Sequence, residues 1–155
     1  MSEIIEKTEE TRKEAVNRAK EFIGRTPLAV IATTNHSTNS SECALIAFTQ
    51  NDNLELFFMT FADSRKYVNL QHHPSLSFVI GFGYNTVQYE GIALELKDEG
   101  VEEARYAFSR KETPCVPEFL NNPRARFFKV TPKWIRYSDY ALCPAEIFEV
   151  SFICH

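Results

Sequence analysis

The sequence predicts a mainly β fold, an antiparallel barrel with Greek-key-like connections and helices at its periphery. The chain has 155 residues, of which 44% are hydrophobic and 13% aromatic, enough to build a substantial core. Six or seven apolar segments of strand length follow one another with turn residues between most of them, a spacing typical of barrels. A G-x-G-x-x-G motif is absent from the sequence, which argues against a dinucleotide-binding Rossmann site. We expect one domain over residues 1–155, without repeats or linkers.

The chain begins with a predicted amphipathic helix at residues 3–24, where apolar side chains recur near a period of 3.6. Gly24 and Pro27 end this helix. Short apolar runs then predict strands at 28–34, 43–49, 54–60, 76–82 and 86–97. A second amphipathic helix is expected at 99–111, before a proline-punctuated segment. Three more extended segments complete the chain, at 126–130, 134–137 (after Pro132) and 145–153.

The stretch after the third strand reads as a polar turn followed by a short helix. Asp63 or Ser64 can cap this helix, and Pro74 stops it. Ser64, Arg65 and Lys66 then lie in or beside the first turn, where free backbone N–H groups favour an anion. A hydroxyl and two cations at one point make a good phosphate site. The alternative is two solvated charges on a surface helix.

The fifth strand carries an informative alternation. Gln88 falls on the same face as Ile92 and Leu94, because side chains alternate with a period of two. Either Gly91 carries a bulge that resets the alternation, or Gln88 points into the interior. A buried amide needs a hydrogen-bond partner, and a bound ligand could be that partner.

Several residues match a known family in order and spacing: Phe57-Phe58-Met59-Thr60, Ser64-Arg65-Lys66, Asn69-Leu70, Pro74 and Thr86-Val87-Gln88-Tyr89-Glu90-Gly91. On these residues the sequence resembles the pyridoxamine 5'-phosphate oxidase-like family, the FMN-binding split barrels. The resemblance is clearest over residues 27–96 and weaker toward the C-terminus. It implies a split β-barrel and a homodimer that binds FMN in a groove between its subunits.

The resemblance also implies roles for individual residues. The Thr60 position lies against the flavin ring system, the Arg65 and Lys66 positions hold the phosphate with support from Ser64, and the Gln88 position contacts the cofactor. Trp134 and Arg136 could reach the cofactor of the neighbouring subunit, although a tryptophan at such a position is more often a core residue. The expected cofactor-binding residues are Met59, Thr60, Ser64, Arg65, Lys66, Gln88 and Trp134.

The sequence departs from the pyridoxamine phosphate oxidases proper. Those enzymes carry R-x-V-L-L-K on the second strand, whereas this chain has Ala44-Leu45-Ile46-Ala47-Phe48-Thr49, without a cation. The C-terminal R-x-H pattern is absent too. Tyr106 and Arg110 match the spacing of two substrate-binding residues, but a one-turn spacing is common. Vitamin B6 oxidation is therefore not expected.

Two classes of function follow. The first is an FMN-dependent oxidoreductase that passes electrons between a nicotinamide or another donor and a small acceptor, with the flavin supplying the chemistry. The second is a flavin- or haem-binding sensor or carrier without turnover, and a deazaflavin could replace FMN. The sequence points to no catalytic acid or base.

Charge and composition exclude other classes. The net charge of −4 argues against nucleic-acid binding. An apolar run of membrane-spanning length and a signal peptide are both missing from the sequence, so a cytoplasmic protein without a membrane partner is expected. Four scattered cysteines are expected to be reduced thiols. The histidines have no metal-ligand spacing, and we predict no metal site.

Overall fold

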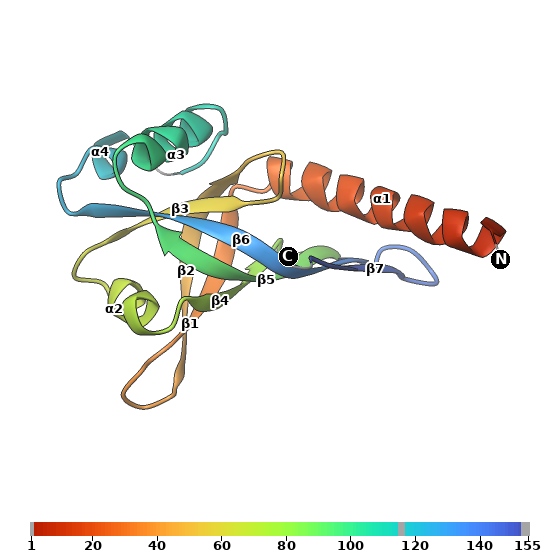
Figure 1. Cartoon of the computed structure of the whole chain (residues 1–155), viewed down its shortest axis with the longest axis horizontal. Coiled ribbons are helices and arrows are strands. Elements are labelled where there is room, and N and C mark those ends of the chain that lie inside the picture. Colours follow the sequence, from red (N-terminus) through yellow and green to blue (C-terminus); the bar gives the residue numbers. More distant parts are fainter. Residues whose placement is uncertain (1, 115–116, 153–155) are drawn as a thin grey trace.

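Six strands close into an antiparallel barrel in the computed structural model, which describes residues 2–114 and 117–152 (Figure 1). The strands are β1 (Leu28–Thr34), β2 (Ser41–Gln50), β3 (Leu56–Phe61), β4 (Ser75–Ile80), β5 (Asn85–Glu95), β6 (Ala125–Asp139) and β7 (Glu146–Ser151). The sheet order is β3-β2-β1-β4-β5-β6-β7, and pairing of β3 with β6 closes the barrel and leaves β7 outside it. Because β4 returns to pair with β1, the first four strands form a Greek key. The predicted fold class is confirmed.

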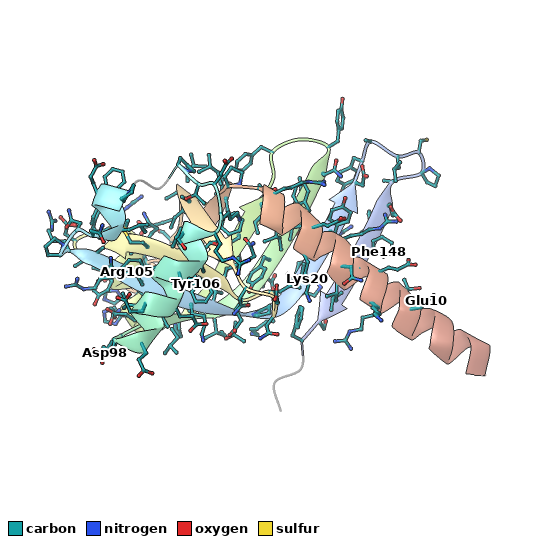
Figure 2. The ribbon with its side chains drawn as sticks, turned by 90° about the horizontal axis from the view of Figure 1, so that it is seen from above. Glu10, Lys20, Asp98, Arg105, Tyr106 and Phe148 are labelled. Carbon is teal, nitrogen blue, oxygen red and sulfur yellow. The ribbon has the colours of Figure 1, made fainter. Side chains whose placement is uncertain are left out.

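In the described part of the chain, four helices surround the barrel: α1 (Ser2–Arg25), α2 (Arg65–His72), α3 (Glu99–Ser109) and α4 (Pro117–Leu120). The C-terminal half of α1 packs on the strands, and the helix runs alongside Phe148 of β7 before projecting beyond the sheet (Figure 2). α3 and α4 lie at the opposite end of the molecule (Figure 1). α4 was not predicted, because its four residues follow prolines and are too few to show a helical period. No helix in the described part of the chain is long and apolar enough to cross a membrane.

The core has two parts that meet at β3. The larger cluster fills the barrel and includes Phe58, and the smaller one packs Phe57 against Ala104 and Phe108 of α3. Phe57 and Phe58 are both fully buried. β3 is therefore covered on both faces, as its continuous apolar sequence predicted. The last residues of β3 lead from this buried region directly into the turn before α2.

β6 is one strand of 15 residues rather than the two separate segments expected around Pro132. The pairing with β5 shifts there, because Glu90 pairs with Trp134 while Gly91 pairs with Pro132. Lys133 is thus an extra residue, and the bulge lets a proline without an N–H stay in the strand. The C-terminal boundary also differs, since β7 ends at Ser151; residue 153 of the predicted strand lies outside the described residues.

Gln88 points outward, so the interior placement considered from the sequence is wrong. The residues that face the barrel interior are Val87, Tyr89, Gly91 and Ala93. Gln88 alternates with them, and the outward-facing Leu94 of the same strand is 63% exposed. The interior placement of Gln88 was inferred from Ile92 and Leu94, which are apolar but belong to the outer face. The irregularity at Gly91 leaves the alternation of β5 unchanged.

Candidate functional site

The first turn of α2 is fixed by a hydroxyl pair. Of the two predicted cap candidates, Ser64 is the N-cap, and its Oγ accepts the backbone N–H of Tyr67 at 3.2 Å. The Oγ atom of Ser64 also lies 2.7 Å from Oγ1 of Thr60, which is buried at the end of β3. The end of β3 and the start of α2 are therefore joined by a side-chain hydrogen bond as well as by the backbone. This connection holds the remaining N–H groups of the turn in place.

A hollow of about 340 Å³, here called the α2 hollow, opens beside this turn. Its apolar lining includes Leu28, Leu45, Ala47, Met59, Phe61 and Phe119. Among the described residues, its polar lining consists of Thr60, Ser64 and Lys66. The hollow thus brings together Met59, Thr60, Ser64 and Lys66 from the residues predicted to bind a cofactor. A flat apolar ligand with an anionic group at one end matches this distribution.

Lys66 is half-buried at the edge of the α2 hollow. Burial lowers the pKa of its ammonium, and the positive charge of Arg65 lowers it further. Within the described residues, the Lys66 side chain makes no hydrogen bond or ion pair. A desolvated and unpaired cation is costly, so an anion bound in the hollow would relieve that cost.

The structure separates the two cations that the sequence placed together. The Arg65 side chain is 73% exposed, and its Nη1 lies 2.7 Å from Oε2 of Glu42 at the start of β2. Arg65 is not among the residues that line the α2 hollow. Consecutive residues of a helix point about 100° apart, so Arg65 and Lys66 leave α2 in different directions. The sequence spacing alone did not carry this information.

Gln88 and Trp134 line a second hollow of about 240 Å³, here called the sheet hollow, with Val30 and Val79 beside them. It lies on the outer face of the strands. Trp134 therefore belongs to this face and not to either core cluster. Arg136, the cross-strand neighbour of Gln88, approaches Glu149 at 3.6 Å, while its Nε is buried without a partner. On one chain, six of the seven predicted site residues are divided between two separate hollows, and Arg65 lines neither of them.

A third hollow, of about 460 Å³, lies next to α3, and the role of Lys111 in it was not predicted. Lys111 lines it and donates to the carbonyl oxygen of Ile23 at 2.9 Å and to Oε1 of Gln50 at 2.7 Å. Its Nζ also lies 3.8 Å from the centre of the Phe48 ring. Burial lowers the pKa of Lys111 to about 7. These partners are far away in the sequence, so no local pattern could reveal the contact.

Tyr106 of α3 and Arg110, the C-cap of that helix, also line this hollow, and Nη1 of Arg110 donates to the Tyr106 hydroxyl at 3.2 Å. The histidines form another unexpected contact, since the rings of His36 and His72 stack with centres 3.7 Å apart. In the described part of the chain, no group of three or more potential ligands is placed to hold a metal ion. Of the cysteines, Cys43 and Cys143 are free and exposed, while Cys115 and Cys154 lie outside the described residues.

A family sequence model shows which known proteins this chain is related to. The sequence model of the pyridoxamine 5'-phosphate oxidase family matches residues 16–139. The chain belongs to this family. No curated protein matches it in sequence.

Solved structures of the pyridoxamine 5'-phosphate oxidase fold are similar in shape. A haem-binding protein from Mycobacterium smegmatis superposes with a TM-score of 0.75 at 13% identity, covering 88% of this chain and 57% of that one. Campylobacter jejuni ChuZ gives 0.69 at 11% identity, over 87% and 58%. General Stress Protein 26 from Bacillus anthracis gives 0.64 at 16% identity, over 87% and 98%. This chain thus spans somewhat more than half of the first two proteins. At these identities the likeness establishes the fold.

Proposed function

We propose that this protein binds FMN and works as an oxidoreductase that passes electrons between a nicotinamide or another donor and a small acceptor. The α2 hollow carries the proposal, since it combines an apolar wall with a capped helix start and an unpaired ammonium. The isoalloxazine ring would rest on the apolar wall near Met59 and Thr60. Its phosphate would meet Ser64, the free N–H groups and Lys66, which together favour an anion.

The residues of the hollow would bind and orient the cofactor rather than take part in proton transfer. Bound FMN supplies the redox chemistry. The Thr60 and Ser64 hydroxyls, fixed at 2.7 Å from each other, are preorganised to hydrogen-bond a ligand. The apolar wall excludes water from the ring, which strengthens the attraction between Lys66 and an anion. Vitamin B6 oxidation is not proposed, because β2 lacks the two cations of those enzymes.

A homodimer would complete the site. In this proposal, Gln88 and Trp134 of one subunit cover the α2 hollow of the other, which accounts for two half-sites on one chain. The outer face of the sheet supports pairing, since Leu45 and Val79 are exposed on it, at 61% and 42%. Light scattering at micromolar concentration should give about twice the chain mass. A monomer that binds flavin tightly would contradict the dimer.

Haem binding without turnover is the second candidate. The structural similarity to the Mycobacterium smegmatis haem-binding protein favours it, because a flat apolar hollow also suits a porphyrin. A deazaflavin, which shares the ring shape of a flavin, is a variant of the first candidate. Cofactor identity separates these possibilities more directly than any activity.

The first experiment is the absorbance spectrum and mass of the chromophore that co-purifies with the protein. Adding NADH or NADPH anaerobically, then candidate acceptors, tests whether a bound flavin turns over. FMN that binds and is reduced and reoxidised supports the oxidoreductase. FMN that binds but resists every physiological donor leaves a carrier or sensor. A protein that takes up haem and ignores flavins would overturn the first candidate.

A further inference from the structure

Glu42 is held in place by buried groups. Its side chain is 15% exposed, and its Oε1 accepts Nδ2 of Asn69 at 2.7 Å. Asn69 is 2% exposed, and the same Nδ2 donates to Oγ1 of Thr33 at 3.0 Å. The carboxylate thus stands at the start of β2 in a fixed position, before any ligand arrives. Its second oxygen is the one that takes the guanidinium of Arg65.

Arg65 is the exposed member of this pair. It belongs to the first turn of α2 and its side chain is mostly exposed, so it can swing about the helix start. Its charge already acts on Lys66. Its Nη1 donates to Oε2 of Glu42, which holds the guanidinium away from the α2 hollow, so the Glu42 carboxylate and a phosphate in that hollow compete for the orientation of Arg65.

We propose that Glu42 withholds Arg65 from the α2 hollow and thereby sets how strongly this site prefers a phosphate-bearing ligand. The inference rests on the proposed function. With Glu42 in place, the phosphate meets Lys66 and the helix start, and FMN gains less over riboflavin than it would with both cations. Glu42 is a specificity-determining residue that touches Arg65 and not the ligand.

The test removes one charge and keeps the shape. Glu42→Gln retains an oxygen for Asn69 but loses the carboxylate that attracts Arg65. We expect it to tighten FMN binding about 10-fold and to leave riboflavin within about 2-fold. Adding Arg65→Ala to Glu42→Gln should abolish the gain. Glu112→Gln, at an exposed glutamate outside the three hollows, changes the net charge equally and is the matched control.

Inorganic phosphate is a second probe that needs no flavin. Backbone amide signals of residues 64–66 should respond to phosphate more strongly in Glu42→Gln than in the unchanged protein. In the double variant, their response should be no stronger than in the unchanged protein. Arg65→Ala alone, which leaves Glu42 untouched, should weaken FMN binding less than about 3-fold. A larger loss would overturn the inference, as would an equal gain in Glu112→Gln or an unchanged phosphate affinity in Glu42→Gln.

The two proposals fail in distinguishable ways. If the amide signals respond to phosphate as expected but neither FMN nor riboflavin binds, the flavin function is wrong and the control of Arg65 by Glu42 stands. If FMN binds and its preference over riboflavin is the same with and without the Glu42 carboxylate, the flavin function stands and the control is wrong.

Discussion

Lys66 and Lys111 are two half-buried lysines whose pKa burial lowers, yet their surroundings differ. Lys111 is satisfied by the protein, through a carbonyl of α1, the Gln50 amide and the Phe48 ring. In the described residues, Lys66 has no such partner. Burial thus lowers the pKa of both lysines, but the amino group of Lys111 has hydrogen-bond partners inside the protein and that of Lys66 has none among the described residues.

The difference distinguishes a structural lysine from one that we propose binds a ligand. Lys111 links the end of α1, the end of β2 and the chain after α3. A lysine beside a hollow without partners among the described residues is a candidate for binding an anion. Exposure alone would not have distinguished them, because both are half-buried.

The largest effect should come from Lys66→Met, which keeps the apolar stem and removes the charge. Losing one charge-assisted hydrogen bond of about 1.5–3 kcal/mol weakens FMN binding roughly 10- to 100-fold. Riboflavin affinity and the free energy of unfolding should change little. Fluorescence quenching with both ligands measures this, and Lys97→Met at an exposed lysine is the control. Equal losses for FMN and riboflavin would sink the phosphate role of Lys66.

Lys111→Met should instead change how stability depends on pH. The folded-state pKa of Lys111 is about 7, against 10.5 for an ordinary lysine. Between these values the unfolded chain binds more protons, so the contribution of Lys111 makes the free energy of unfolding rise as pH goes from about 7 to 10.5, and this contribution levels off below about 7. Solvent screening leaves only part of the roughly 1.4 kcal/mol per pH unit that one full proton gives.

Urea unfolding of Lys111→Met and of the unchanged protein, at about pH 6.5, 8 and 9.5, measures this difference. The variant should lack the contribution of this lysine to the rise, and its flavin affinity should stay unchanged. A variant whose pH dependence matches that of the unchanged protein would show that Lys111 is not a desolvated cation, and the contrast with Lys66 would collapse.

Ser64→Ala should affect both stability and FMN binding, because Ser64 caps α2 and also lines the α2 hollow. Losing the cap costs roughly 1 kcal/mol of unfolding free energy. FMN binding should weaken as well, since the first turn would lose its anchor on Thr60. Thermal unfolding with and without FMN separates the two effects. A loss of stability without loss of affinity would make Ser64 purely structural.

The smallest effect is expected for Gln88→Leu, which extends the comparison from cations to amides. Gln88 is exposed and, within the described residues, its side chain has no hydrogen-bond partner, so the fold should be kept. In the proposed dimer it touches the flavin, and the variant should shift the flavin absorbance or weaken FMN less than about 10-fold. An unchanged spectrum and affinity would leave Gln88 an ordinary surface residue.

Local signals made the start of α2 predictable, and long-range contacts made the rest unpredictable. The Ser64 cap and the alternation of β5 follow from neighbouring residues, so the sequence reveals both. The pairing of Arg65 with Glu42 and of Lys111 with Ile23 joins residues that only the fold brings together. The facing of Gln88 was misjudged because the outer sheet surface is itself apolar around Leu94.

β6 has one further consequence for how the molecule opens. One edge of this strand pairs with β5 along nearly its whole length, while the other is shared, first by β3 and then by β7, with Pro132 between them. The two halves of a single strand therefore belong to different cooperative units. Amide hydrogens of β6 that face β7 should exchange with solvent when β7 detaches locally. Those that face β3 should exchange only when the β3–β6 pairing that closes the barrel opens.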